Sequence, residues 1–220
     1  MSALRVSLVQ EPLAWHDPPA NRERFSALLT PLAQRTDLIV LPETFTSGFS
    51  MEVERLAERA GGPTVTWMQA QAARTDAAIT GSVITAEDGK YYNRLLFVLP
   101  CGEVRHYDKR HLFRMGREHE HFTPGRSAWS TPWRGLRICP LVCYDLRFPV
   151  FSRRARIWTT MCWCTSPTGR RRAPRPGGNC CGHGPSRIRL TWWASTGSGR
   201  TAPALPTPVT ARPSTSSGGR

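Results

Sequence analysis

The strongest constraint on this 220-residue chain is an abrupt change in its charge after residue 150. Residues 1–150 carry 18 lysines and arginines against 16 aspartates and glutamates, a mixture that is typical of globular domains. Residues 151–220 carry 12 arginines, no lysine and no acidic residue. These compositions predict one folded part, residues 1–153, followed by a low-complexity tail rich in Arg, Pro, Gly and Ser, residues 154–220.

The first part has the hydrophobic periods of a layered α/β domain. Apolar stretches of strand length alternate with segments of helical spacing, and Asn21 is the expected N-terminal cap of the first helix. Glu87–Asp88–Gly89 lies between two strand-like stretches and is typical of a β-hairpin. The mixture of strands, hairpins and helices predicts an α/β fold. The expected strands are 4–10, 38–41, 77–85, 91–99, 103–107 and 136–142, and the expected helices are 21–34, 51–60 and 64–73.

The composition also argues against a membrane protein. No apolar run approaches the ~20 residues that a membrane helix requires. The first apolar stretch is interrupted by Arg5, Gln10 and Glu11, which is unlike a secretion signal. We therefore expect a cytoplasmic protein without a membrane partner, whose 7 cysteines are thiols rather than disulfides.

Three motifs place a chemically useful side chain directly after a strand-like stretch. The side chains are a carboxylate, Glu43, an ammonium, Lys109, and a thiol, Cys143. Strand ends are where open α/β sheets collect ligands and catalytic groups. The motifs are 41–45 (LPETF), 107–113 (YDKRHLF) and 141–149 (LVCYDLRFP).

These three groups suit the hydrolysis of an unactivated amide. A thiol with a pKa of ~8.5 is mostly protonated at neutral pH and needs a base. A carboxylate whose pKa is raised by burial can take that proton and later deliver it to departing ammonia. A fixed ammonium and a backbone N–H can stabilise the oxyanion. Taken singly, each of the three would be an ordinary core or surface residue, so their joint context carries the prediction.

In order and in flanking residues, the motifs resemble those of the nitrilase, or carbon–nitrogen hydrolase, superfamily. The similarity can be followed from Ser2 to Arg153 and is greatest to the omega-amidase branch, through 45–49 (FTSGF) and 109–115 (KRHLFRM). The resemblance implies a four-layer α-β-β-α sandwich, here truncated and followed by an irregular basic tail. It implies hydrolysis of the ω-amide of a small 2-oxo acid, of the 2-oxoglutaramate type, without a cofactor. For an intact chain it also implies a homodimer.

The resemblance assigns the main catalytic roles. Glu43 would be the general base, Lys109 would stabilise the intermediate, and Cys143 would form the thioester. The backbone N–H of Tyr144 would donate a hydrogen bond to the oxyanion.

Supporting roles follow from the same resemblance. Glu118 is expected to orient the lysine or the substrate, with Glu120 two residues away as the alternative. Asp145 and Arg147 are expected to brace the turn after the nucleophile rather than to touch the substrate.

The resemblance stops near Arg153, and the genetic code offers a reason. If the last base of each codon is joined to the first two of the next, Thr159 becomes aspartate, and Cys162 and Cys164 become valine, whichever codons are used. The shifted segment then matches the strand that the family has after its nucleophile. We therefore hypothesise a frameshift between about Arg153 and Trp158. We expect impaired hydrolysis, because a central strand, a covering helix and part of the pocket wall would be missing.

Other interpretations concern the tail and the substrate. Cys162, Cys164, Cys180, Cys181 and His183 form a cysteine-rich cluster, but their spacing is irregular for zinc, so no metal is expected. The arginines would attract polyanions nonspecifically, and no base-reading module is visible, so no specific nucleic-acid partner is expected. Within the enzyme class, the alternative substrate is another small aliphatic amide or a nitrile.

Overall fold

The computed structural model describes residues 4–126, 129–148, 150–151, 159–166 and 187–194. Its larger sheet has six strands in the order β1-β2-β4-β5-β6, with β3 paired to β4. Strands β1, β2 and β4 run parallel, whereas β4, β5 and β6 are antiparallel neighbours. The strands are β1 (Val6–Leu8), β2 (Leu38–Val40), β3 (Glu58–Arg59), β4 (Ala78–Glu87), β5 (Lys90–Val98) and β6 (Val104–Asp108).

The predicted hairpin joins β4 to β5. Asp88 and Gly89 at its tip have φ angles of 49° and 69°. Positive φ at both central residues is what a tight two-residue hairpin turn requires, and an Asp-Gly pair tolerates it. The hairpin prediction is therefore confirmed.

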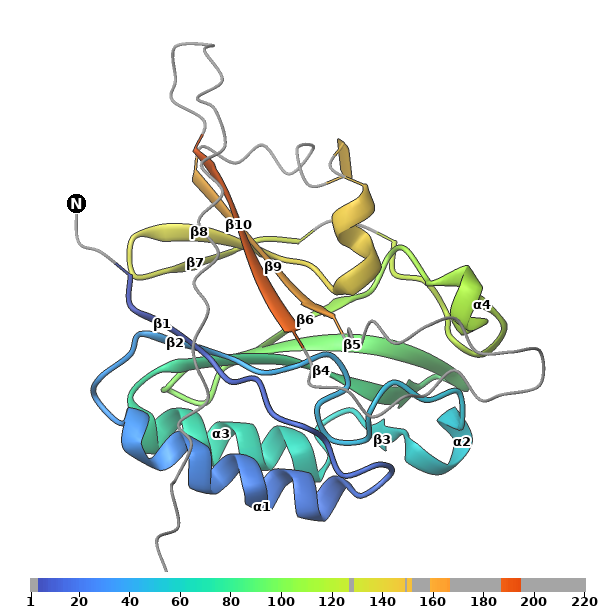
Figure 1. Cartoon of the computed structure of the whole chain (residues 1–220), viewed down its shortest axis with the longest axis horizontal. Helices are drawn as coiled ribbons and strands as arrows, with labels where there is room; N and C mark the ends of the chain where they lie inside the picture. Colours follow the sequence, from blue (N-terminus) through green and yellow to red (C-terminus); the bar gives the residue numbers. More distant parts are fainter. Residues whose placement is uncertain (1–3, 127–128, 149, 152–158, 167–186, 195–220) are drawn as a thin grey trace, which may run out of the picture.

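Helices α1 (Pro18–Leu29) and α3 (Pro63–Thr75) cover one face of the larger sheet (Figure 1). Phe25 of α1 and Met68 of α3 are fully buried and belong to the same apolar cluster as Ile79 of β4. This cluster attaches the helical layer to the sheet. The short helices are α2 (Val53–Leu56), α4 (Glu118–His121) and the 3₁₀ segments η1 (Thr30–Leu32), η2 (Arg114–Gly116) and η3 (Cys143–Arg147). The helix predicted for 51–60 was too long, because β3 takes up its end.

The start of α1 corrects the predicted cap. Asp17, not Asn21, caps the helix, and its side chain accepts the N–H of Ala20 at 3.0 Å. Asn21 lies inside the first turn and is fully buried. Its Nδ2 donates to the carbonyls of Ala14 and Thr46 at 2.7 and 2.6 Å. Asn21 thus ties the helix to the loop that follows Glu43 instead of ending it.

A second sheet lies on the other side of the larger sheet from α1 and α3 (Figure 1). Its strand order is β10-β9-β8-β7, and β8 and β9 are parallel. Ile138 of β8 packs with Leu38, Val40 and Phe97 of the larger sheet. The described residues therefore form three layers, and the second helical layer of the expected four is not among them. The strands are β7 (Thr131–Trp133), β8 (Leu136–Pro140), β9 (Thr159–Ser166) and β10 (Arg187–Ala194).

Two short segments of the tail lie in the smaller sheet. Residues 159–166 pair with β8, and residues 187–194 pair antiparallel with residues 159–166. Both segments, TTMCWCTS and RIRLTWWA, are rich in β-branched and aromatic residues, which favour strands even without a clear hydrophobic period. Within the part of the chain that the structure describes, no helix is long and apolar enough to cross a membrane.

Candidate active site

Three strand ends present Glu43, Lys109 and Cys143. Glu43 follows β2 and Lys109 follows β6, both in the larger sheet, whereas Cys143 follows β8 of the smaller sheet. The backbone at Thr44 and at Cys143 has a φ angle of 44°. That region is sparsely populated by residues with a side chain, and strain of this kind is concentrated at functional positions. Both sheets thus contribute chemical groups from unusual turns.

The Lys109 side chain is fully buried between two carboxylates. Its Nζ donates to Oε1 of Glu43 at 2.8 Å and to Oε1 and Oε2 of Glu118 at 3.0 and 2.9 Å. Both glutamate side chains are fully buried as well. The ammonium also lies 5.4 Å from the centre of the Phe49 ring. Burying a charge without a partner costs a large desolvation free energy. The ammonium and the two carboxylates therefore stabilise one another in the interior.

Burial gives the cluster unusual proton affinities. It raises the pKa of Glu43, and the neighbouring Glu118 adds to the rise while the Lys109 charge opposes it. For Lys109, burial favours a lower pKa, but the charges of Glu43, Glu118 and Cys143 outweigh it and raise the pKa. Lys109 therefore stays charged at neutral pH, beside a carboxyl group whose pKa lies above its ordinary value.

The turn that carries Cys143 is fastened to the loop that carries Lys109. Asp145 is fully buried and accepts hydrogen bonds from the Tyr107 hydroxyl at 2.9 Å and from the backbone N–H of Val142 at 3.1 Å. It also accepts the backbone N–H of His111 at 2.9 Å, and the Nδ1 of that imidazole lies 2.7 Å from the same oxygen. Asp145 thus braces the turn that carries Cys143.

The structure distinguishes the two glutamates that were considered for the supporting role. Glu118 lies against Lys109 and also accepts the backbone N–H of Phe113 at 2.6 Å. Glu120 lies on the surface, where it pairs with Arg117 at 2.6 Å. Arg147 is exposed.

A close backbone approach fixes the start of the Lys109 loop. The N–H of Gly125 donates to the Lys109 carbonyl at 3.0 Å. A Cβ atom at Gly125 would lie 2.0 Å from the carbonyl oxygen of Asp108, so a side chain there would force the backbone apart. The glycine that follows Pro124 is therefore needed for the position of the lysine.

Asn93 in β5 also belongs to the cluster, although the sequence patterns do not single it out. Its Nδ2 donates to Oε1 of Glu43 at 2.8 Å and to Oε1 of Glu118 at 3.0 Å. Its backbone carbonyl accepts the N–H of Lys109 at 3.0 Å. The signal in the sequence is a single uncharged polar residue at a buried position of a mostly apolar strand.

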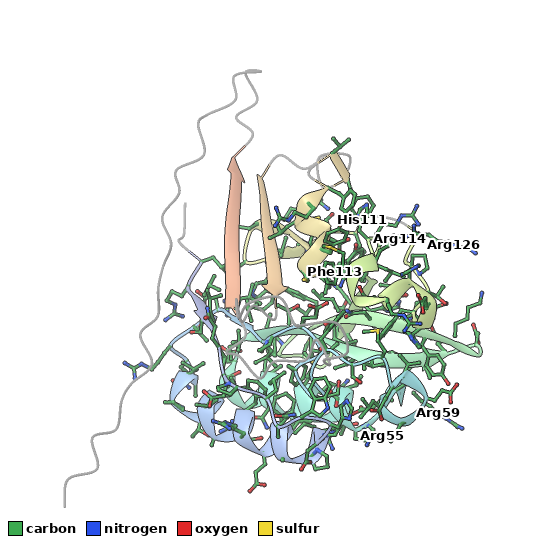
Figure 2. The ribbon with its side chains drawn as sticks, turned by 45° about the vertical axis from the view of Figure 1, so that its right-hand side comes forward. Arg55, Arg59, His111, Phe113, Arg114 and Arg126 are labelled. Carbon is green, nitrogen blue, oxygen red and sulfur yellow. The ribbon has the colours of Figure 1, made fainter. Side chains whose placement is uncertain are left out.

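A cleft of about 290 Å³ opens beside Tyr144, the residue after Cys143. The Tyr144 ring contacts Phe113 edge-on, with ring centres 5.3 Å apart. Figure 2 shows His111, Phe113 and Arg114 together on this side of the molecule. The Arg114 side chain is exposed and makes no hydrogen bond or ion pair with any residue that the structure describes. The cleft is lined by Arg110, His111, Leu112, Arg114, His119, Pro124, Tyr144 and Phe148.

The cysteine-rich cluster of the tail, from Cys162 to His183, lies outside the side chains that the structure describes. Within the described residues, no three His, Cys, Asp or Glu side chains group in a way that could hold a metal ion. Cys101 is exposed and Cys139 is buried, while Cys143 is half-buried.

A model of the carbon–nitrogen hydrolase family matches residues 5–175 of the sequence. The chain belongs to the carbon–nitrogen hydrolase family. This carbon–nitrogen hydrolase is 50% identical over 153 residues to the omega-amidase YafV of Escherichia coli, covering 70% of this chain and 59% of that relative. It is 26% identical over 152 residues to the 2-oxoglutaramate amidase of Bacillus subtilis, covering 68% of this chain and 59% of that relative.

A solved structure supports the same placement. The carbon–nitrogen hydrolase superfamily protein of Xanthomonas campestris, which has an arsenic adduct in its active site, is 55% identical and superimposes with a TM-score of 0.67. The match covers 69% of this chain and 57% of that chain. This carbon–nitrogen hydrolase therefore spans less than two thirds of the length of the relatives that it matches.

Proposed function

We propose that this carbon–nitrogen hydrolase carries the catalytic groups of an amidase for the ω-amide of a small 2-oxo acid. The products are a carboxylate and ammonia. Glu43 is the general base, Lys109 stabilises the oxyanion, and Cys143 is the nucleophile. The supporting observation is the Lys109 ammonium held between two buried carboxylates, with the turn of Cys143 fastened to the Lys109 loop through the hydrogen bonds of Asp145.

In the first half-reaction, Glu43 takes the thiol proton as the Cys143 sulfur attacks the amide carbon. The carbonyl oxygen becomes an oxyanion, which accepts hydrogen bonds from the Lys109 ammonium and the backbone N–H of Tyr144. When the C–N bond breaks, Glu43 returns the proton to the nitrogen, and ammonia leaves. A thioester remains on the sulfur. The raised pKa of Glu43 suits both directions of this transfer, because a catalytic acid–base group works best near the ambient pH.

In the second half-reaction, a water molecule attacks the thioester. Glu43 takes a proton from the water, the C–S bond breaks, and the proton returns to the sulfur. The carboxylic acid loses its remaining proton to solvent and leaves as a carboxylate. Glu118 takes no part in the proton transfers. It orients the Lys109 ammonium throughout, because both of its carboxylate oxygens accept hydrogen bonds from Nζ.

The cleft beside Tyr144 supports a substrate with a carboxylate. Arg114 offers a guanidinium without a partner among the described residues, and Arg110 and His119 line the same cleft. Arginine is suited to binding a carboxylate through two parallel hydrogen bonds. The YafV relative is an omega-amidase and the Bacillus subtilis relative a 2-oxoglutaramate amidase, which favour a 2-oxo acid over a simple amide.

We also propose that the 220-residue chain turns over its substrate poorly. On the frameshift hypothesis, residues 154–220 replace a covering helix and part of the pocket wall, and β9 stands beside β8 where the original central strand is expected. Catalytic groups misplaced by about 1 Å can lose about 100-fold in rate. The chain would therefore retain the polar cluster of Glu43, Lys109 and Glu118 but lack the full pocket.

The test is ammonia release by a frame-corrected chain, made by a one-base correction between codons 153 and 158. We expect 2-oxoglutaramate to be hydrolysed at least about tenfold more efficiently than propionamide or propionitrile, since the carboxylate adds a charged hydrogen bond. Cys143→Ala should abolish the reaction, and Cys101→Ala should not change it. Preference for propionamide or the nitrile would overturn the substrate, and activity in Cys143→Ala would overturn the mechanism.

A further inference from the structure

Asn93 is an uncharged side chain that donates hydrogen bonds to both buried glutamates. It is 1% exposed, and its Nδ2 donates to Oε1 of each carboxylate. The Oδ1 atom of Asn93 is buried and has no hydrogen-bond partner among the described residues. A buried amide oxygen without a hydrogen bond lowers stability. The amide of Asn93 is therefore oriented so that its N–H groups reach the two carboxylates, although its oxygen is left without a partner.

The two carboxylate oxygens of Glu43 differ in their hydrogen bonds. Oε1 accepts two hydrogen bonds, from Asn93 at 2.8 Å and from Lys109 at 2.8 Å. Oε2 is buried and accepts none from any described residue. The carboxylate is therefore fixed through one oxygen, and the other oxygen is the one available to exchange a proton.

We propose that Asn93 is a positioning residue, which holds Oε1 of Glu43 so that Oε2 exchanges the proton with the Cys143 thiol. This inference rests on the proposed function, because it assigns the oxygen through which Glu43 acts as a base. Asn93 does not touch the substrate. It acts through Glu43, and by bridging to Glu118 it keeps both carboxylates oriented around one ammonium.

An uncharged donor is required at this place. The charged groups that face Glu43 are Lys109 and Glu118, and Cys143 contributes to the raised pKa of Lys109. Two carboxylates already share one cation. A third carboxylate at residue 93 would repel both, whereas the amide supplies two N–H donors without adding charge.

The role of Asn93 should be visible in the proton affinity of Glu43. Burial raises the pKa of Glu43, and the hydrogen bond from Asn93 opposes that rise. Loss of the bond should raise the pKa further. Proton transfer from the thiol would then require a higher pH. A residue that only fills space in the strand would not move this pH dependence.

The experiment uses the full 220-residue chain and iodoacetamide, and it does not depend on turnover. The sulfur of Cys143 displaces iodide from the reagent, forming an S–C bond while the thiol proton goes to Glu43 or to solvent. Mass spectrometry of the peptide that contains Cys143 gives the rate of alkylation at each pH. Exposed Cys101 is the internal reference in every sample. Thr80→Val is the matched control, because Thr80 is buried in β4 and donates one hydrogen bond, to the Leu96 carbonyl at 2.8 Å.

We expect Asn93→Ala to slow the alkylation of Cys143 at neutral pH by about tenfold, the effect of losing one hydrogen bond to a charged group. The midpoint of the pH profile should move upward. Asn93→Asp keeps the shape of the side chain, so it tests the charge without creating a cavity. It should slow alkylation at least as much as Asn93→Ala. A purely structural role predicts the reverse order, with the isosteric variant the milder.

The outcomes separate this inference from the proposed function. If both Asn93 variants leave the rate and midpoint equal to those of Thr80→Val, while Glu43→Gln slows Cys143, only the role of Asn93 is overturned. If Cys143 in the parent chain reacts no faster than Cys101, the activated thiol itself is absent, and both proposals fail. Should Asn93→Ala not fold, the comparison of Asn93→Asp with Thr80→Val decides the matter alone.

Discussion

In the first 150 residues, buried charges have partners. Lys109 lies between Glu43 and Glu118, and the nearly buried guanidinium of Arg94 contacts Asp108 and Glu87, each at 2.7 Å. The last seventy residues have 12 arginines and no carboxylate of their own. The first part has the balance of charges that a polar active site in a folded interior requires. The second part cannot supply such a balance from its own sequence.

On the frameshift hypothesis, the difference between the two parts has a simple explanation. β-Branched and aromatic residues favour strands, and β9 pairs parallel to β8, where the resemblance leads us to expect the next strand. Charge pairing needs particular residues at particular positions, which a shifted frame does not retain. The frameshift hypothesis therefore accounts for a tail that has strands but no acidic residues.

Correcting the frame should have the largest effect. The frame-corrected chain should release ammonia from 2-oxoglutaramate at least about 1,000-fold faster than the 220-residue chain, because a single misplacement in a site already costs about 100-fold. Equal rates, measured with the same coupled ammonia assay, would show that residues 154–220 are not the cause of any impairment. Resequencing codons 153–158 is the independent control.

Removing the buried ammonium of Lys109 should have the second largest effect. In the frame-corrected chain, Lys109→Met should lower the free energy of unfolding by about 3–5 kcal/mol, because it leaves two buried carboxylates without their cation. The raised pKa of Lys109 means that this contribution is present at neutral pH and is lost as the pH rises above about 10.4 toward the higher folded value. Urea denaturation measures the change. Lys90→Met, on an exposed residue, should change it by less than about 0.5 kcal/mol.

Arg114 should have a smaller effect, confined to substrate binding. Arg114→Ala should raise KM for 2-oxoglutaramate about tenfold and leave kcat nearly unchanged, since it removes one charged hydrogen-bonding group from the cleft. Arg117→Ala is the matched control, because Arg117 is exposed nearby but paired with Glu120. If both variants have the same KM, the cleft does not bind the carboxylate.

The pH dependence should show the smallest change. Glu43 must be ionised to act as the base, and burial raises its pKa. The acid limb of kcat/KM should therefore lie above the value of about 4.3 for an ordinary glutamate, and activity should fall as the pH drops through that limb. A limb at or below pH 4.3 in the frame-corrected chain would contradict the description of Glu43 as a buried base.

The sequence alone predicted candidate residues that lie in motifs. Glu43, Lys109 and Cys143 were predicted because each follows a strand-like stretch and because the three motifs resemble those of the nitrilase superfamily. Glu118 was predicted from that resemblance. Asn93 was missed, since it lies 50 residues from Glu43 along the chain and meets it only when β5 is placed in the sheet. A contact between distant strands leaves no local pattern.

The errors in the fold have similar causes. Asn21 is a residue type that often caps helices, which is why it was predicted as the cap. In the structure its side chain instead donates hydrogen bonds to the carbonyls of Ala14 and Thr46, which are tertiary contacts. Strand β7 is only three residues long and was not predicted, because its pairing with β8 rather than any hydrophobic period defines it. The strands β9 and β10 of the tail also show no clear hydrophobic period, and they too are defined by their pairing with neighbouring strands.

The pairing of one thiol with a carboxylate and an ammonium can be tested in the 220-residue chain by its reaction with acrylamide, an electrophilic carboxamide. The rate of adduct formation on Cys143, relative to Cys101, should be at least about tenfold higher, and Glu43→Gln should remove that difference, because it removes the base. A Cys143 that reacts no faster than Cys101, or one that is unaffected by Glu43→Gln, would contradict the assignment of this site.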